Sequence, residues 1–451
     1  MAWKIGEKLP EGTVLKTLHG ETVTVLGFIA GGGQADVYRA SWKNGTYALK
    51  WYNKTEADTI GSEQYHNLKK LSQYPNPDPA YFVWPLSMVT ESGAETPKSL
   101  FGYVMELLPE GYHELKYYLC DDANPKRQRF TSFHAMIRCA LQIVTAVGIL
   151  HRKGMIYKDL NPGNVIIQNS TGSIRMVDCD NISVEGSPCT VAGMHGYMAP
   201  EIVRSNYRVT PNINTDMYSE AVLLFKLFYM DHPMEGKHWA DYEVHTDKVV
   251  DELYSIHPVY NMSSKDSSNR PGLGFAPNVI PRMQRLPAIL RKGFEEAFTD
   301  GIDHPTKRPS ENRWMDYLTT ARDQFTFLDQ ACKKEQCVVF SEPKTIPPGC
   351  LRMTVGSAKR VWAVYPMQNL FENTVTNLHA DYQKRIGWVT VNNGKLYMQN
   401  LSGKDWVAFD PDSRKTAVIR DKQGFPVKAG TQIMFSQTPK IVGVIDDPRR
   451  T

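Results

Sequence analysis

The first hundred residues contain short strand-like segments in which apolar and polar residues alternate and which glycines interrupt. Alternation with a period of two is typical of β-strands, because successive side chains point to opposite faces of a sheet. One stretch with helical spacing, residues 62–71, lies among these segments. A β-rich region with a single helix is therefore predicted, and its expected strands are residues 22–29, 36–40, 47–52 and 102–107.

The apolar pattern becomes helical after residue 130. Between 130 and 153, apolar residues recur every three or four positions, as on one face of a helix. They are Ile137, Leu141, Val144, Val147 and Leu150. Further helices are expected at residues 216–230, 286–298 and 310–328, with a long loop at 255–281.

Beyond about residue 340 the pattern changes again. Pro343, Pro347, Pro348 and Gly349 indicate a linker, because proline and glycine interrupt regular structure. Short alternating segments separated by turns then follow, which predicts a small all-β sandwich. The expected strands are residues 361–364, 388–391, 395–399, 407–409, 416–419 and 432–435.

The composition is that of an ordinary folded protein of 451 residues, long enough for about two or three domains. A net charge of +4 is small for this length and gives no reason to expect nucleic acid or a membrane surface as a partner. Apolar runs such as residues 143–150 are too short to span a bilayer. Residues 1–7 contain no apolar signal core, and the seven scattered cysteines fit a reducing compartment, so a cytoplasmic location is expected.

The segment YKDLNPGN, residues 157–164, contains the most informative chemistry of the chain. It places the carboxylate of Asp159 and the carboxamide of Asn164 five residues apart, just before a strand-like segment. A second carboxylate, Asp178, ends the next strand-like segment. This set suits phosphoryl transfer, in which one carboxylate orients and deprotonates a hydroxyl while an Asn and an Asp hold magnesium on a nucleotide.

These two segments resemble the catalytic loop, H-R-D-L-x-x-x-N, and the metal-binding D-F-G of the protein kinase family. The resemblance implies that Asp159 is the catalytic base, that Asn164 and Asp178 bind Mg²⁺, and that ATP is the cosubstrate. Asn161 stands where the family has a lysine two residues after the base. A charge-assisted contact of about 1.5–3 kcal/mol would be lost there, which slows transfer about ten- to a hundredfold.

A glycine-containing loop lies between the first and second strand-like segments, residues 22–29 and 36–40. Backbone amides without side chains approach phosphate oxygens closely, although a mobile hairpin turn explains the same residues. Against the family pattern G-x-G-x-x-G-x-V, alanines replace two glycines, at positions 30 and 35. The next strand contains the family's A-x-K, whose lysine, Lys50, pairs with the nucleotide phosphates. The residues expected to contact the nucleotide on this side are Gly31, Gly32, Gly33, Val37 and Ala48.

In active members of the family, a glutamate of the following helix holds that lysine. The sequence leaves two candidates: Glu63 is the only neighbouring carboxylate, whereas Gln64 occupies the family position when counted back from Leu68 and Leu71. The resemblance also implies that Met105 is the gatekeeper. The backbone at Glu106 and Leu108 is expected to hydrogen-bond adenine.

Three further features, an A-P-E segment, Asp216 and Arg308, favour a protein substrate. Residues 198–201 match A-P-E, whose glutamate pairs with an arginine in the family, here Arg308; residues 216–219 resemble the D-x-[WY]-S that braces the catalytic loop. The pattern Leu160-x-Pro162-x-Asn164 is closer to serine/threonine kinases than to tyrosine kinases. Residues 178–180, Asp-Cys-Asp, replace D-F-G, a variant that suggests a bacterial type.

The tail is distantly similar to a forkhead-associated β-sandwich. Of the residues that grip phosphothreonine in that family only Arg385 is present, so a docking or regulatory role is preferred to phosphate binding. Cys332, Cys337 and Cys350 lack a fourth ligand at a suitable spacing, so free thiols are preferred to zinc.

The predicted fold is α+β: a bilobal, protein-kinase-like fold followed by a small all-β sandwich. The expected domains are the kinase N-lobe at 1–108, the C-lobe at 109–328, a linker at 329–352 and the sandwich at 353–451. The predicted activity is that of a bacterial-type serine/threonine protein kinase using ATP and Mg²⁺ on protein substrates, with a partner phosphatase and other signalling-cassette proteins implied by the resemblance. The alternatives are a pseudokinase scaffold, which the altered residues favour, and a small-molecule kinase.

Overall fold

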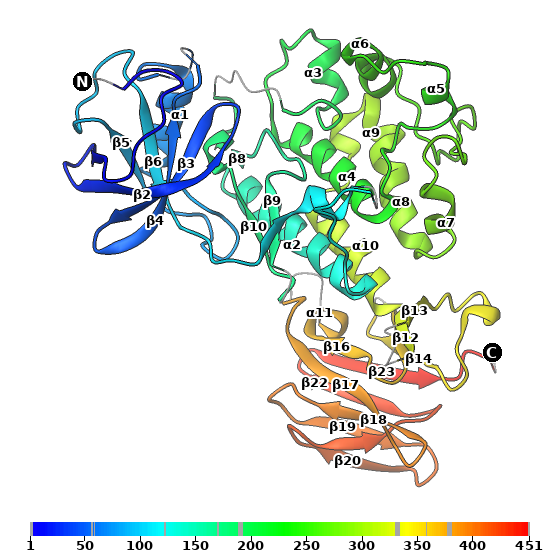
Figure 1. The fold of residues 1–451 in the computed structure, drawn as a ribbon. Coiled ribbons are helices and arrows are strands. Elements are labelled where there is room, and N and C mark those ends of the chain that lie inside the picture. The colour runs from blue at the N-terminus through cyan, green and yellow to red at the C-terminus, as the bar shows by residue number, and fades with distance from the viewer. Residues whose placement is uncertain are drawn as a thin grey trace. The chain divides into compact units, whose positions relative to one another are not determined.

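The computed structural model describes residues 3–449 except 56, 58, 121–122, 169–170, 188–192, 330–333, 358 and 377–380 (Figure 1). The chain divides into two compact units, and each is described by itself. The first comprises Met1–Gln128, Thr145–Leu223 and Tyr242–Pro258. The second comprises Arg129–Val144, Leu224–Asp241 and Val259–Thr451.

The first unit begins with a closed antiparallel barrel in the order β1-β2-β3-β4-β6-β5. Its core contains Val23, Tyr38, Leu49, Trp51 and Val104, all of which are buried. The four predicted strands are confirmed, whereas the four-residue β1 and β5 were too short to stand out as patterns. The strands are β1 (Val14–Thr17), β2 (Thr22–Gly31), β3 (Ala35–Trp42), β4 (Gly45–Tyr52), β5 (Ser87–Thr90) and β6 (Phe101–Met105).

Helix α1 (Glu63–Leu71) is the helix predicted within the β-rich region. It begins at the N-cap Ser62, whose side chain accepts a hydrogen bond from the backbone amide of Tyr65. One face is buried, through Tyr65, Leu68 and Leu71. Gln64 and Asn67 lie beside Leu68 and Leu71 on the helix and are partly buried, and they make the contacts described below.

The remaining elements of the first unit are short. Strand β9 pairs with both β10 and β7, and β8 pairs with β11. Because β8 ends at Ile156 and β9 begins at Val165, these two strands fix both ends of residues 157–164. The elements are β7 (Tyr112–Glu114), η1 (Leu115–Tyr118), β8 (Met155–Ile156), β9 (Val165–Gln168), β10 (Ile174–Met176), η2 (Cys179–Asn181), β11 (Ser183–Val184), α3 (Pro200–Arg204), α6 (Asp247–Asp251) and η3 (Glu252–Ile256).

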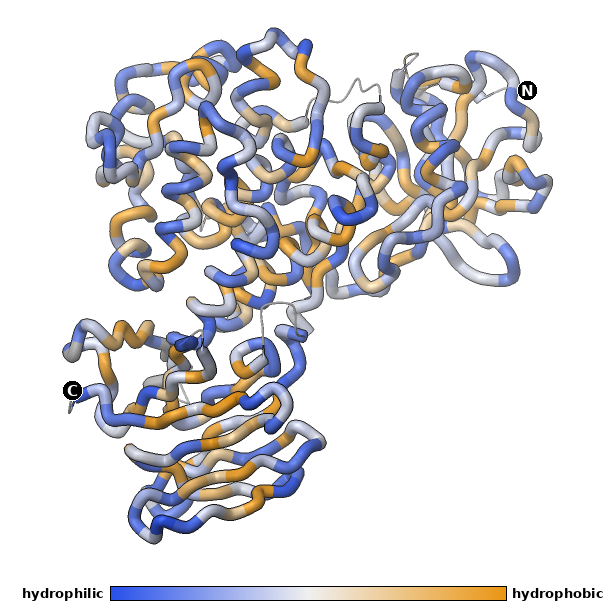
Figure 2. The backbone as a smooth tube through the Cα atoms, turned by 180° about the vertical axis from the view of Figure 1, so that it is seen from behind, coloured by the Kyte–Doolittle hydropathy of each residue, from blue (hydrophilic) through white to orange (hydrophobic). Residues whose placement is uncertain are grey.

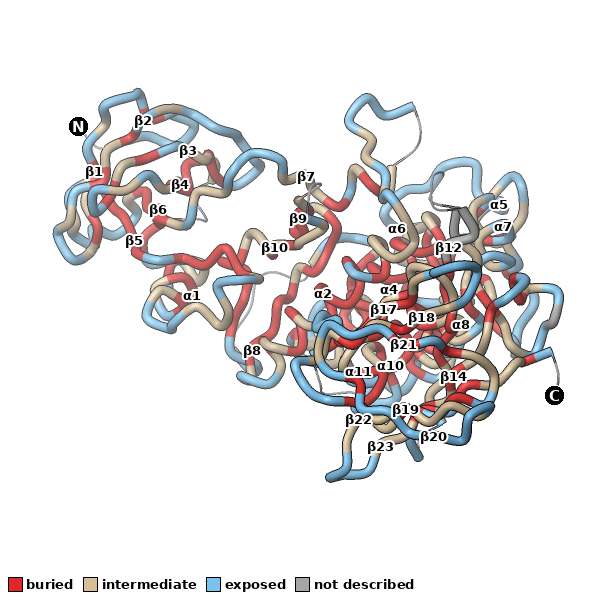
Figure 3. The backbone as a smooth tube through the Cα atoms, turned by 90° about the horizontal axis from the view of Figure 1, so that it is seen from below, coloured by how far each residue is buried: buried red, intermediate tan, exposed pale blue. Residues whose placement is uncertain are grey.

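Two long apolar helices, α2 (Phe133–Arg152) and α4 (Ile213–Tyr229), confirm the expected helical region. Most of their residues are buried (Figure 3). By length and composition alone, α2 could cross a membrane, which the short apolar runs of the sequence did not lead us to expect. However, 61% of that stretch is buried within the protein, as in a core helix of a folded domain.

The second unit contains the other helices and the tail. The helix expected at 310–328 ends at Asp323, and the following residues form strand β12, which pairs with β13 in a hairpin. Helix propensity alone does not register this pairing, because it depends on residues farther along the chain. The elements are α5 (Lys237–Ala240), α7 (Val279–Met283), α8 (Ala288–Phe298), α9 (Asp300–Asp303), η4 (Pro305–Lys307), α10 (Glu311–Asp323), β12 (Phe325–Asp329), β13 (Lys334–Cys337) and η5 (Pro343–Thr345).

The tail forms two antiparallel sheets, of order β15-β14-β23-β22-β19-β20 and β16-β17-β18-β21. Residues of both sheets share one hydrophobic core that includes Trp362, Trp406, Met398 and Ile433, an arrangement compatible with the predicted sandwich. Hydrophobic and hydrophilic residues alternate along the strands (Figure 2). The elements are β14 (Leu351–Val355), β15 (Arg360–Val364), β16 (Asn369–Phe371), α11 (Glu372–Val375), β17 (Arg385–Asn392), β18 (Lys395–Asn400), β19 (Trp406–Asp410), β20 (Lys415–Ile419), β21 (Gly424–Pro426), β22 (Gln432–Gln437) and β23 (Lys440–Asp446).

The stretch expected to be a linker, 329–352, contains folded structure. Besides β13 and η5, it contributes Val338, Ile346 and Cys350 to a small buried cluster with Ala363 of β15. The prolines therefore mark turns between packed segments. Cys332 lies outside the described residues, so the predicted state of the three-cysteine group is not settled by Cys337 and Cys350.

A buried polar cluster joins the end of α10 to the tail. The Arg322 guanidinium donates to Asp323 Oδ1 (3.0 Å), to the carbonyl of Tyr382 (2.8 Å) and to Asn373 Oδ1 (3.0 Å). Thr374 Oγ1 in turn donates to Asp323 Oδ2 (2.7 Å). Since Arg322 and Asp323 are both buried, these bonds fix the end of α10 to α11 and to the loop that follows α11.

Candidate functional site

The loop of residues 157–164 is held in place by Asp216, near the start of α4. Its buried carboxylate accepts hydrogen bonds from the backbone amides of Tyr157 (2.5 Å) and Lys158 (3.0 Å) and contacts His151 Nε2 (3.2 Å). Lys158 has φ 68°, a left-handed conformation that is uncommon for a residue other than glycine. The brace expected from the Asp216 motif is therefore present in the geometry.

Asp159 lies within this loop and is surrounded by amide side chains. Asn164 Nδ2 donates to Asp159 Oδ2 (3.0 Å) and to the Asp159 carbonyl (2.9 Å). Burial raises the pKa of Asp159 above the ordinary aspartate range; the nearby charge of Asp178 adds to this, and hydrogen bonds from Asn161 and Asn164 only partly oppose it. A carboxylate with a raised pKa is a better proton acceptor than an exposed aspartate.

Asn161 stabilises the loop backbone. Its Nδ2 donates to the Asp159 carbonyl (3.1 Å), and its Oδ1 accepts from the amide of Gly163 (2.8 Å). The side chain is buried, and it cannot supply the positive charge of the lysine that the family has at this position.

The predicted metal ligands lie on neighbouring strand ends. The Asn164 carbonyl accepts a hydrogen bond from the amide of Val177 (3.0 Å), directly before Asp178. Asp178 has φ 51°, and its side chain is 47% exposed. Its Oδ1 lies 3.1 Å from Lys50 Nζ. Lys50, Asp159, Asn164 and Asp178 are thereby brought together from three separate parts of the sequence.

The donor atoms of this group fit Mg²⁺ on a nucleotide. Asn164 Oδ1 and Asp178 Oδ2 have no hydrogen-bond partner among the described residues, so both oxygens are available. In the part of the chain that the structure describes, no group of three or more His, Cys, Asp or Glu side chains could hold a metal ion. Magnesium in nucleotide sites takes only one or two protein ligands, the rest coming from phosphate and water.

Lys50 also forms an ion pair with Asp180, a contact that the sequence did not predict. Its Nζ lies 3.1 Å from Asp180 Oδ1 and 3.0 Å from Oδ2. Burial lowers the pKa of Lys50, but the charges of Asp180 and Asp178 outweigh it and raise that pKa well above its usual value. The lysine is therefore charged at neutral pH. The only sequence signal for this contact was the second carboxylate of Asp178-Cys179-Asp180.

The helix α1 supplies no carboxylate to Lys50. Gln64 is the α1 residue that reaches the site: its Nε2 lies 3.2 Å from the Tyr52 hydroxyl and 3.3 Å from the Asp180 carbonyl. Glu63 makes no hydrogen bond within the described structure, and its Oε1 is buried. The prediction that Glu63 contributes to nucleotide binding finds no support in this geometry.

The glycine loop is the hairpin turn between β2 and β3. The amide of Gly32 donates to the carbonyl of Ala35 (2.9 Å), and Gly31, Gly32 and Gly33 are exposed. A Cβ at Gly31 would lie 2.8 Å from Asp36 Oδ1, so a side chain at this position would require the buried Asp36 carboxylate to move. On the neighbouring strands Val37 pairs with Lys50, which places the turn beside the lysine's strand.

The expected adenine-binding segment leaves the barrel at the end of β6. Ala48 is buried and pairs with Met105, which is half-buried. The Glu106 carboxylate is bound by the Arg175 guanidinium. Leu108 has no hydrogen bond to any described residue, so its backbone amide and carbonyl are free for a ligand.

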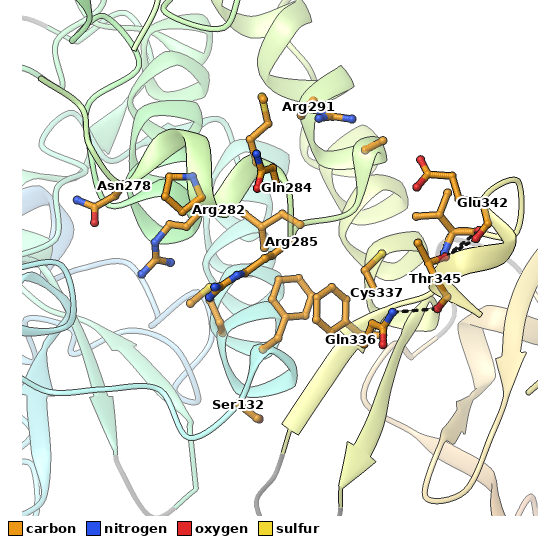
Figure 4. A pocket seen from close by; sticks show the side chains of 18 of the residues that line it. Ser132, Asn278, Arg282, Gln284, Arg285, Arg291, Gln336, Cys337, Glu342 and Thr345 are labelled. Carbon is orange, nitrogen blue, oxygen red and sulfur yellow. Dashed lines mark hydrogen bonds between the residues drawn. The ribbon is translucent and has the colours of Figure 1, made fainter. Parts of the chain in front are cut away.

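A separate cavity lies within the second unit, with a volume of about 1260 Å³. Aromatic side chains (Phe133, Phe325) and basic ones (Arg285, Arg291) line it, together with Gln336 and Cys337 of β13 (Figure 4). None of the residues predicted to bind nucleotide or metal belongs to this lining.

Comparison with known proteins gives a family match. A model described as "Protein kinase domain" matches residues 23–290, more than half of the chain. Protein kinase C delta type of Mus musculus is 34% identical over 146 residues, which are 32% of this chain and 20% of that protein. Probable serine/threonine-protein kinase gdt4 of Dictyostelium discoideum is 28% identical over 228 residues, 48% of this chain and 12% of that protein.

A third relative, the cAMP-dependent protein kinase, catalytic subunit-like, of Caenorhabditis briggsae, is 26% identical over 238 residues, 52% of this chain and 55% of that protein. The matched regions thus span between 12% and 55% of these relatives' own lengths. All three are eukaryotic proteins, and none supports the predicted bacterial type. Nothing in the comparisons supports the forkhead-associated likeness of the tail, where Arg385 is exposed and lies 3.4 Å from Asn369 Oδ1.

Proposed function

Because the chain belongs to the protein kinase family, we propose that it is an active serine/threonine protein kinase that transfers the γ-phosphoryl group of ATP to a protein hydroxyl. The family fold is bilobal, and the β1–β6 barrel is its β-rich lobe. The observation that carries the proposal is the meeting of Lys50, Asp159, Asn164 and Asp178 over a loop braced by Asp216.

Each of these residues has a role that its surroundings support. Asp159, with its raised pKa, accepts the proton of the substrate hydroxyl as the new O–P bond forms. Lys50 offers a buried positive charge to phosphate oxygens. Asn164 Oδ1 and Asp178 Oδ2, which have no hydrogen-bond partner among the described residues, would hold Mg²⁺. ATP would supply the phosphoryl group that is transferred, and Mg²⁺ would neutralise charge on its phosphates.

Protein substrates fit the family and the two motifs that follow the site, A-P-E and Asp216. We also propose a docking or regulatory role for the tail at 353–451. A partner phosphatase, other signalling-cassette proteins and a cytoplasmic location remain predictions from the sequence.

A pseudokinase scaffold is the second candidate, and Asn161 favours it. Its side chain is committed to the loop backbone, so no residue at this position balances charge during transfer. The four retained chemical residues favour the enzyme, and the loss at position 161 is expected to slow it about ten- to a hundredfold.

The test is transfer of labelled phosphate from ATP with Mg²⁺ by the purified chain, offered both protein and small-molecule acceptors. Asp159→Asn and Lys50→Met are each expected to lose at least about a hundredfold in rate. Asp405→Asn and Lys395→Met, exposed positions of the tail, serve as matched controls and are expected to stay within about twofold of the unsubstituted chain. Nucleotide binding without transfer to any acceptor would favour the scaffold, and transfer only to small molecules would contradict a protein substrate.

A further inference from the structure

Lys50 is held by two carboxylates that differ sharply in their surroundings. The Asp178 side chain is 47% exposed and contacts Lys50 through one oxygen. The Asp180 side chain is 1% exposed and contacts Lys50 through both oxygens. Of the two, only Asp178 is free to turn towards a ligand without burying an unpaired charge.

We infer that Asp180 is the permanent anionic partner of Lys50, the role that a glutamate of the following helix has in other members of the family. Asp180 is thus a positioning residue that aims Lys50 at the nucleotide phosphates and leaves Asp178 to the metal. The inference deepens the proposed function and rests on it, because it assigns the arrangement of that same site.

The hydrogen bonds of Asp180 show that it is fixed. Besides Lys50, its Oδ1 accepts from the Tyr103 hydroxyl (3.0 Å), and its Oδ2 accepts from the Tyr52 hydroxyl. Tyr52 lies on the lysine's own strand, β4, and Tyr103 lies on the adjacent strand, β6, where it pairs with Lys50. A buried carboxylate with two charge-assisted and two hydroxyl hydrogen bonds has little reason to leave its position.

Helix α1 holds the backbone on which Asp180 stands. Asn67 Nδ2 donates to the carbonyls of Asp180 (3.1 Å) and Ile182 (2.9 Å), and Gln64 Nε2 lies 3.3 Å from the Asp180 carbonyl. The helix therefore contributes amides where the family contributes a carboxylate. The helix is still linked to Lys50, but through Asp180: α1 binds the Asp180 carbonyl, and the Asp180 carboxylate binds Lys50.

A glutamine at position 64 is consistent with Asp180, and not a residue of α1, being the carboxylate that pairs with Lys50. Gln64 Nε2 lies 3.4 Å from Asp180 Oδ2, so a glutamate there would bring two carboxylates together in a buried site. Like charges at such a distance cannot both stay ionised without a large cost. One carboxylate is sufficient for Lys50, and in this chain it is on residue 180.

The test compares Asp180→Asn with the matched control Glu63→Gln, which removes a carboxylate from α1 that makes no side-chain hydrogen bond to any described residue. Mg²⁺–ATP affinity is measured by calorimetric titration, and KM and kcat by phosphate transfer. Asp180→Asn is expected to weaken ATP affinity about tenfold or more, whereas Glu63→Gln stays within about twofold. Equal affinity of Asp180→Asn and the unsubstituted chain would overturn the inference.

A second pair of variants separates positioning from folding. Gln64→Glu alone is expected to weaken ATP binding, because its carboxylate faces Asp180; in the Asp180→Asn background it is expected to restore affinity, because it then supplies the missing charge. A double variant no better than Asp180→Asn would contradict the inference, even if the single variant folds poorly. Affinity is read without turnover, so a chain that binds ATP but transfers nothing refutes the proposed enzyme and still decides the role of Asp180.

Discussion

Two buried ion-pair networks, one in each unit, show how differently the same chemistry is used. Around Arg322, the cation, its neighbour Asp323 and their partners are all enclosed, and the guanidinium stacks 3.9 Å from the centre of the Phe371 ring. Around Lys50, one carboxylate is enclosed and the other, Asp178, is half exposed. We call the fully buried Arg322 cluster the closed network and the Lys50 cluster, with its exposed Asp178, the open network. The closed network stabilises the fold, whereas the exposed carboxylate of the open network is available to a ligand.

The largest effect on stability is expected at the closed network. Arg322→Met leaves Asp323 buried without its cation, so the free energy of unfolding should fall by about 3–5 kcal/mol. Denaturant unfolding followed by circular dichroism measures this. The ATP affinity of the folded fraction should stay within about twofold, because Arg322 belongs to no predicted nucleotide contact.

A double variant sharpens this prediction. Arg322→Met with Asp323→Leu removes both charges, and apolar replacement of a whole buried pair is often neutral or stabilising. The double variant is expected to regain most of the lost stability. If it is as unstable as the single variant, the hydrogen bonds to Tyr382 and Asn373 outweigh the charge term.

An intermediate effect is expected at the open network, and on activity instead of stability. Asp178→Asn removes a half-exposed pair, which contributes less than about 1 kcal/mol to unfolding. Phosphate transfer should fall about a hundredfold or more, because a predicted Mg²⁺ ligand is lost. Thermal unfolding and transfer rates over a range of Mg²⁺ concentrations separate the two outcomes. A variant that keeps its rate would remove Asp178 from the metal site.

The smallest effect is a pH dependence at Asp159. Its pKa is raised in the folded protein, mainly by burial, so the folded state holds this proton more tightly than the unfolded chain. Stability therefore falls as pH rises from below the unfolded pKa through the folded one. Asp159→Asn lacks this fall, so the stability difference between the two proteins should change over that acidic window. Parallel curves would show that the pKa of Asp159 is not raised.

The sequence predicted those parts of the site that local motifs define. The barrel strands, α1, the loop at 157–164 and its brace by Asp216 follow from short patterns whose spacing is set by neighbouring residues. The contact between Lys50 and Asp180 joins positions 130 residues apart, and it depends on the left-handed turn at Asp178. No periodic pattern encodes such a meeting, although the second aspartate and the glutamine at 64 were visible clues.

The tail illustrates the same limit. The alternating strands were predictable, but Arg322-Asp323 at a helix end resembles an ordinary solvated pair in the sequence. Its burial depends on Asn373 of α11 and on Tyr382 in the loop that follows this helix, about fifty to sixty residues later. Likewise, Phe325–Asp329 became a strand only because Lys334–Cys337 pairs with it.

The side-chain amides of Gln64 and Asn67 donate to the backbone carbonyls of Asp180 and Ile182. These contacts of α1 therefore depend on the backbone conformation of residues 180–182. The carboxylate that pairs with Lys50 and the carbonyls that accept hydrogen bonds from α1 lie on the same short turn, residues 180–182. A substitution that displaced this turn would therefore break the Lys50–Asp180 contact and the contacts of α1 at the same time.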